Sequence, residues 1–186
     1  QPFVDPTGYK IYIPEYNNKR IRQLSSSLAN DLTGTLTDIG VSSALTYFFT
    51  DMQMYDDGTK VFVKDTSANR IRQYSLSTAW DITTMSTTSL VLLDITLTAG
   101  YFHRGMHFNN DGTELYVVTN DTSPNVTKIH NWTLSTGFSL GTAGSETIND
   151  VTSTMPSTAN SVIVLEDGSD TYTLLGGSAV PEGYAY

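Results

Sequence analysis

Three histidines are the side chains in this sequence best suited to hold a metal ion: His103, His107 and His130. His103 and His107 fall in one expected strand, four residues apart, so they share a face but lie about 13 Å apart at the rise of an extended chain. A single ion does not bridge that gap, and no Asp or Glu stands between them. We therefore expect no metal site and no cofactor, and interpret these histidines as structural or surface residues.

Asp-Gly corners recur along the chain and suggest calcium as a second possible ligand. A calcium loop of the EF-hand type needs acidic oxygens at alternate positions and a distal Glu, and none of these corners has that pattern. Hairpin-turn chemistry accounts for them, with Asp167 to Asp170 the nearest to an exception. The acidic residues of these corners are Asp56, Asp57, Asp111, Asp167 and Asp170.

A basic-Ile-basic element occurs three times, at residues 20–22, 70–72 and 128–130, and contains four of the five arginines. Alternate residues of a strand share a face, so Arg70, Arg72 and Tyr74 point the same way. The favoured interpretation is that the long stems pack between neighbouring sheets and the charged groups meet carboxylates there. The alternative is a basic stripe that contacts an anionic glycan or a partner. The residues we consider for such contact are Arg22, Arg72, Trp132, Tyr184 and Tyr186.

Familiar catalytic motifs are absent from the sequence. There is no G-x-S-x-G nucleophile elbow and no glycine-rich phosphate loop leading into a helix. The absence of Cys removes thiolate nucleophiles and thiolate metal sites together. We therefore predict no catalytic residue.

The composition indicates the elements that must position these side chains. Ser and Thr number 19 and 28, whereas Glu and Lys together number ten. Helical proteins cover their solvent faces with Glu, Lys, Gln and Ala, while Thr, Val, Tyr and Ile suit a pleated surface. The composition predicts an all-β protein.

An internal repeat organises the chain. Residues 8–33 align with 58–83 without a gap, with identity at eleven of 26 positions. The Asp-Gly-Thr turn and the strand after it return at 111–117, and 71–78 returns at 129–136. A shorter fourth copy of the repeat spans 162–175. Repeats of 40 to 55 residues with Gly-centred turns are typical of β-propeller blades.

Each copy is expected to hold up to four strands. In the second copy we place strands at 47–55, 60–65 and 70–76, and an outer strand within 85–97. The first copy has room only for a stub at Phe3–Val4, and the fourth ends after two strands, which gives about 13 strands. The expected copies are 3–46, 47–97, 101–156 and 159–175, which form one repeat domain (1–175) followed by a tail (176–186). The expected core comprises Ile11, Ile13, Ile21, Val61, Val63, Ile71, Leu76, Leu115, Val117, Ile129 and Leu134, with Trp80, Trp132 and Phe138 at the corners.

The repeat unit, Asp-Gly-Thr-Lys followed by a short apolar strand and then Ile-Arg-Gln-Tyr-Ser-Leu-Ser-Thr-Ala-Trp-Asp, resembles the YVTN/WD40-like β-propeller repeats of phage virion and bacterial surface proteins. The resemblance covers residues 3–175. It implies a propeller-like all-β fold. The expected strands amount to about three and a half blades, which would form an incomplete or four-bladed ring. Propeller lactonases and quinone-dependent dehydrogenases of this kind build their channels from six or more blades, and this chain has fewer.

The expected function is therefore a non-enzymatic structural or adhesive module of a virion or extracellular surface assembly, located outside the cell or on the virion. The alternative is a carbohydrate-binding propeller. A pI near 4.5 argues against nucleic-acid binding. The sequence has no run of about 18 apolar residues, so we expect no membrane insertion.

The ends of the chain suggest how such a module would assemble. The sequence opens Gln1-Pro2-Phe3 without an initiator Met, so we expect a processed chain or a piece of a longer one. The expected partners are copies of the chain or other subunits, joined by strand addition or by docking of the tail. The alternative is that the two ends pair within one four-bladed monomer.

Overall fold

The computed structural model describes residues 2–55, 57–95, 101–122, 125–152, 159–166 and 171–177. Within these ranges the regular elements are β-strands and two short 3-10 helices, η1 (Ile82–Thr84) and η2 (Leu140–Thr142). The expected all-β class is confirmed. None of the helical turns in the described ranges is long and apolar enough to cross a bilayer.

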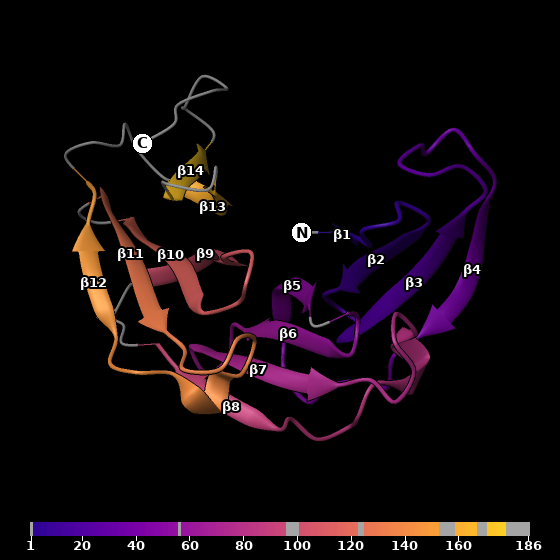
Figure 1. Cartoon of the computed structure of the whole chain (residues 1–186), viewed down its shortest axis with the longest axis horizontal. Helices are drawn as coiled ribbons and strands as arrows, with labels where there is room; N and C mark the ends of the chain where they lie inside the picture. Colours follow the sequence, from indigo (N-terminus) through magenta and orange to yellow (C-terminus); the bar gives the residue numbers. More distant parts are fainter. Residues whose placement is uncertain are drawn as a thin grey trace. The chain divides into compact units, whose positions relative to one another are not determined.

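Residues 1–94 form one compact unit with two four-stranded antiparallel sheets (Figure 1). Consecutive strands pair in both sheets, which is the arrangement of a propeller blade. The outer strand of the second sheet, at Val91–Asp94, lies within the expected 85–97 region, and η1 forms in the segment before that region. The strands are β1 (Phe3–Val4), β2 (Lys10–Glu15), β3 (Arg20–Ser26), β4 (Leu36–Val41), β5 (Phe49–Tyr55), β6 (Lys60–Asp65), β7 (Arg70–Ser75) and β8 (Val91–Asp94).

Residues 95–186 form the second unit. Its four-stranded sheet repeats the same order, and a two-stranded sheet packs beside β9. Among the described residues, three four-stranded sheets and one two-stranded sheet match the expected three and a half blades. The last strand includes the first two residues of the expected tail, and 178–186 lie outside the described residues. The strands are β9 (Tyr101–Phe108), β10 (Glu114–Thr122), β11 (Asn125–Thr133), β12 (Thr147–Asp150), β13 (Ala159–Glu166) and β14 (Thr171–Gly177).

A corner is repeated in the first three sheets. The turn glycine has a positive φ of 76° at Gly8, 80° at Gly58 and 72° at Gly112. A second positive-φ residue lies against each glycine: Asn30, Trp80 and Phe138, at 54°, 60° and 53°. In each corner the backbone N–H of this second residue donates to the glycine carbonyl at 2.9 Å. Because these corners share one backbone geometry, differences between the copies come from their side chains.

The core of the first unit lies mainly between its two sheets and includes Tyr12, Ile21, Phe49, Val61 and Val63. Nine of the eleven aliphatic positions expected in the core are buried, and so is Trp132. Ile13, Ile129, Trp80 and Phe138 are half-buried. Trp80 and Phe138 are only half-buried because each ring covers a turn glycine at the edge of its sheet.

Candidate functional site

The four arginines of the first two copies are held in ion pairs. Arg20 Nε and Arg22 Nε each lie 2.6 Å from a Glu15 carboxylate oxygen, and Arg22 also pairs with Asp38. Hydrogen bonds from Arg20 and then Arg22 hold the pKa of Glu15 at about 2. This geometry supports the packing interpretation of the basic-Ile-basic element.

His130 takes the equivalent place in the third copy. Its side chain is buried, with Nδ1 2.7 Å from Glu146 Oε1 and Nε2 2.9 Å from Thr119 Oγ1. Its ring stacks on Trp132, which is 2% exposed. Burial lowers the pKa of His130, although the hydrogen bond with Glu146 acts in the opposite direction.

This environment predicts that the protein loses stability as the pH falls below about 6.5. The unfolded chain then binds a proton at His130 that the folded protein resists, so the free energy of unfolding rises with pH across this window. Urea unfolding midpoints at pH 5.5, 6.5 and 7.5 test this. His130→Gln should reduce the dependence of the unfolding midpoint on pH, whereas the control His107→Gln should leave that dependence as it is in the wild type. An equal slope in the wild type and in His130→Gln would assign the effect to other groups.

Arg72 has the most completely built surroundings of the basic residues. It lies in β7, and Asp65 ends β6, the adjacent strand of the same hairpin. The Asp65 side chain is fully buried, and its Oδ2 accepts from Arg72 Nε at 2.8 Å and from Arg72 Nη2 at 2.6 Å. Its Oδ1 accepts from the backbone N–H groups of Ser67 and Ala68. Asp65 therefore fixes the guanidinium of Arg72, while Nη1 takes no part in this pairing.

Two tyrosines complete the surroundings of Arg72. The guanidinium carbon lies 4.2 Å from the centre of the Tyr47 ring, a cation–π distance. The hydroxyls of Tyr47 and Tyr74 hydrogen-bond to each other. Burial raises the pKa of both tyrosines, and so both hydroxyls stay neutral at physiological pH.

These side chains open onto a pocket of about 200 Å³ on the first unit, which we call the Arg72 pocket. Its walls come from the segment that leads into β5, from β7 and from the segment before β8. Arg72 reaches it with a side chain that is 19% exposed. The polar lining residues are Thr46, Tyr47, Arg72, Tyr74, Thr87, Thr88 and Ser89.

The lining determines which chemistry the Arg72 pocket supports. One guanidinium with several hydroxyls suits a ligand that carries a carboxylate or phosphate together with hydroxyls. The residues that line the pocket include no carboxylate and no imidazole, so the pocket provides binding groups and not a general base. In the described part of the chain, no three His, Cys, Asp or Glu side chains cluster closely enough to hold a metal ion.

The residues considered from sequence for partner contact do not gather at one place. Arg72 lines the pocket, Arg22 is held by its two carboxylates, Trp132 is buried against His130, and Tyr184 and Tyr186 lie outside the described residues. Tyr74 could have been added from sequence, because it lies two residues from Arg72 on the same strand face. Tyr47 reaches the pocket from the segment that leads into β5, and its position in the sequence does not predict its contact with Arg72.

Comparison with known proteins identifies no family from sequence. No family model matches the chain, and no curated protein matches it.

Solved structures do share its fold. A "putative 6-phosphogluconolactonase" from Bacteroides fragilis matches with a TM-score of 0.58 and 10% identity, over 94% of this chain and 46% of its own. One of the same name from Bacteroides uniformis matches with 0.56 and 11%, over 94% and 46%. A protein from Lactobacillus plantarum matches with 0.58 and 14%, over 100% and 52%. The chain thus spans about half the length of these proteins, and the likeness supports the propeller-like fold.

This comparison corrects the functional expectation. Neither the non-enzymatic structural or adhesive virion module nor the carbohydrate-binding alternative is supported, and two of the matched structures bear the name of an enzyme. The prediction that the chain is not an enzyme rested on the absence of familiar catalytic motifs and on its small number of blades. The names of these two structures contradict that prediction. The argument from blade number was wrong because it required one short chain to build a whole channel, whereas a pocket such as that of Arg72 needs only one sheet and its neighbouring segments.

Proposed function

We propose that this chain is part of a β-propeller enzyme that acts on a sugar-acid lactone. The observation that carries the proposal is the Arg72 pocket, in which a fixed guanidinium and neutral hydroxyls share one small opening. The names of two structures with the same fold add the substrate class, a phosphorylated sugar lactone.

The pocket suits one end of such a substrate. Its volume of about 200 Å³ is below the roughly 300 Å³ at which sites for whole small molecules begin, so it takes a phosphate or carboxylate with the adjoining hydroxyls. Arg72 Nη1 offers donors to the anion. The hydroxyls of Tyr74, Thr88 and Ser89 match the alternating donors and acceptors of a polyol.

The residues that line the pocket indicate which part of the reaction it supports. Lactone opening adds the oxygen of a water molecule to the carbonyl carbon and breaks the ring C–O bond. One proton of the water ends on the leaving ring oxygen, which becomes a hydroxyl, and the carboxylic acid that forms releases the other proton to solvent. Because both tyrosines are neutral and Arg72 is a cation, these groups bind and orient the substrate. The group that activates water must come from residues outside this pocket.

Arg72→Lys tests the binding role and should weaken binding about tenfold, because a lysine ammonium keeps the charge beside Asp65 but loses the planar fork. The readouts are the rate of proton release from 6-phosphogluconolactone and the binding of 6-phosphogluconate by the full chain, followed by NMR titration. Arg22→Lys, at the same position of the first copy, is the matched control and should match wild type. Failure of the wild type to bind 6-phosphogluconate, or equal effects of the two variants, would contradict the proposal.

Three finer assignments stay proposals beside this one. The Asp-Gly-Thr turns and the recurring Ile-Arg-Gln element support repeats of the YVTN/WD40-like type. Association with further copies or other subunits, and a location outside the cell, remain predictions from sequence. The molar mass of the full chain, measured by light scattering across a concentration series, tests the association.

A further inference from the structure

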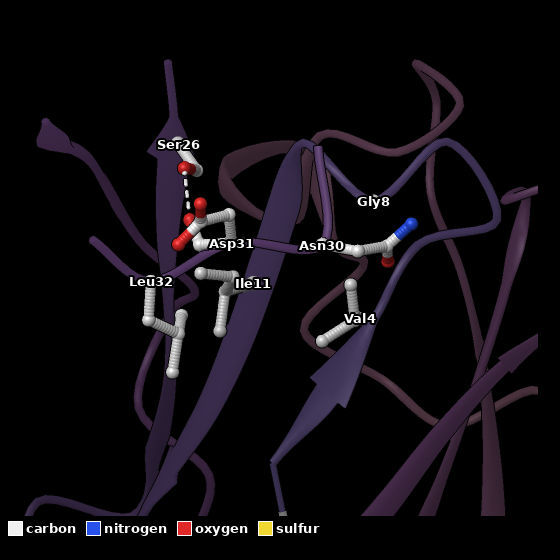
Figure 2. A pocket seen from close by; sticks show the side chains of 7 residues that line it. All are labelled: Val4, Gly8, Ile11, Ser26, Asn30, Asp31 and Leu32. Carbon is white, nitrogen blue, oxygen red and sulfur yellow. Dashed lines mark hydrogen bonds between the residues drawn. The ribbon is translucent and has the colours of Figure 1, made fainter. Parts of the chain in front are cut away.

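A second pocket, of about 250 Å³, lies in the first sheet of the first unit, and we call it the Asn30 pocket. Figure 2 shows Asn30 beside Gly8 and Val4 on one side, and Asp31, Leu32 and Ile11 on the other. It shares no lining residue with the Arg72 pocket. The lining is Val4, Gly8, Ile11, Ser26, Asn30, Asp31 and Leu32.

The repeat shows what occupies this space in the other copies. The equivalent of Asn30 is Trp80 in the second copy and Phe138 in the third, and each ring lies over its turn glycine. Two other lining side chains are also smaller in the first copy. Val4 stands where the later copies have Met54 and Phe108. Ser26 stands where they have Leu76 and Leu134. The first copy has therefore lost side-chain volume on three walls of the same corner.

The backbone of the corner has not adjusted to that loss. Asn30 keeps the positive φ and the 2.9 Å hydrogen bond to the glycine carbonyl that Trp80 and Phe138 have. Leu32 is 71% exposed and Val4 43%, whereas their equivalents Ile82 and Met54 are 0% and 2% exposed. The Asn30 pocket is thus a corner shaped for an aromatic ring that this copy does not supply.

We infer that the Asn30 pocket binds a small planar aromatic molecule that carries an N–H or O–H donor, of the indole or phenol class. The apolar walls of Val4, Ile11 and Leu32 take the faces of the ring. The volume suits one or two fused rings, since apolar cavities of about 150 Å³ already hold a benzene-sized molecule.

The polar rim determines which edge the ligand presents. The Asn30 amide and the Asp31 carboxylate stand at the opening (Figure 2). Hydrogen bonds from Thr33 lower the pKa of Asp31, which keeps it ionised at neutral pH. An ionised carboxylate accepts from a donor and repels anions, and the chain's formal charge of −9 adds to that repulsion. Indole and phenol should therefore bind, and benzoate should bind far more weakly.

This inference does not depend on the proposed function, because its pocket and ligand class are separate. Loss of aromatic binding would leave lactone chemistry at Arg72 untouched, and the reverse also holds.

The test is a titration of the full ¹⁵N-labelled chain with indole, phenol and benzoate. Saturable shifts of amides around Gly8 and Asn30 are expected, with a midpoint on the order of 1 mM for a ligand of about nine heavy atoms. Asn30→Trp puts the side chain of the second copy into the corner, so it should abolish binding and raise the Tm by about 2–4 °C. Asn69→Trp is the matched control, because Asn69 is an exposed asparagine with a φ of 52° away from the pocket.

Val4→Phe, which copies Phe108, fills the pocket from a second lining position and should also abolish binding if Asn30→Trp fails to fold. Unchanged spectra of the wild type at 10-fold the expected midpoint would overturn the inference, as would indole binding that survives both filling variants. A wild-type molar mass that doubles in light scattering, and returns to monomer in Asn30→Trp, would identify the pocket as a protein interface and overturn it as well.

Discussion

Replacing Gly58 with alanine is expected to lower the free energy of unfolding by about 3 kcal/mol, which combines a positive-φ cost of about 1 kcal/mol with a packing clash of about 2 kcal/mol. Gly58 has a φ of 80°, and a Cβ built there would lie well within 3.0 Å of three atoms of the Trp80 ring. The ring cannot easily withdraw. It stacks on Phe3, and its residue's carbonyl accepts hydrogen bonds from Tyr12 and Gln23.

Gly8→Ala is the matched comparison, because Gly8 occupies the same turn of the first copy with a φ of 76°. Its added Cβ would meet the end of the Asn30 side chain at 2.5 Å, and that short amide can rotate toward the neighbouring pocket. We expect a loss of about 1 to 1.5 kcal/mol, close to the backbone cost alone. The difference between the two variants measures the clash with the ring.

Urea unfolding of the full chain provides both values. A double variant, Gly58→Ala with Trp80→Ala, should cost less than the sum of the two single changes, because removal of the ring relieves the clash. Equal losses of free energy of unfolding for Gly58→Ala and Gly8→Ala would show that the Trp80 ring moves aside without cost, which would contradict the expected clash.

The repeat made much of this fold predictable from sequence. The strand expected at 60–65 is β6, and the stub expected at Phe3–Val4 is β1. Both follow from a period of 50 residues and from Asp-Gly turns, which limit where a hairpin can reverse. A local signal repeated several times is more reliable than any single copy of it.

The outer strands were less predictable because side chains compete with strand pairing there. In the second copy, Asp81 accepts from the backbone N–H of Thr83, and η1 forms in the segment before the expected 85–97 region, where no element was predicted. Ser, Thr and Asp form such local bonds readily, so they weaken the strand signal. The left-handed backbone at Trp80 was also unforeseeable, since a large residue adopts it only when packing and hydrogen bonds from distant residues compensate.

The Arg72 site was predictable only in part. The spacing of Arg72 and Tyr74 places both on one face of a strand, and this much followed from sequence. Tyr47 comes from a connecting segment 25 residues before Arg72, and its hydroxyl meets that of Tyr74 only once β5 and β7 belong to one sheet. Such a contact has no local pattern, because it depends on the tertiary path of the chain.

Arg72→Leu is expected to lower the free energy of unfolding by about 3 kcal/mol, since removal of one partner of a buried pair leaves the other charge uncompensated. Asp65 has a side-chain exposure of 0%, and without Arg72 it would keep only the two backbone donors of Ser67 and Ala68. The loss of the cation over the Tyr47 ring adds to the effect.

Arg22→Leu, at the same position of the first copy, should have a much smaller effect. Its partners Glu15 and Asp38 have side chains that are 18% and 53% exposed, so water solvates them once the arginine is gone. The two arginines therefore share a repeat position and a strand face, and differ chiefly in the burial of their partners.

Asp65→Leu combined with Arg72→Leu decides whether the buried charge is the cause. A double apolar replacement removes both charges, so it should recover at least half of the stability lost in Arg72→Leu, measured by urea unfolding. The contrary result is a double variant that loses as much free energy of unfolding as its two single variants lose together. In that case the arginine stem and its contact with Tyr47 stabilise this corner, and the ion pair serves to orient Arg72 toward the pocket.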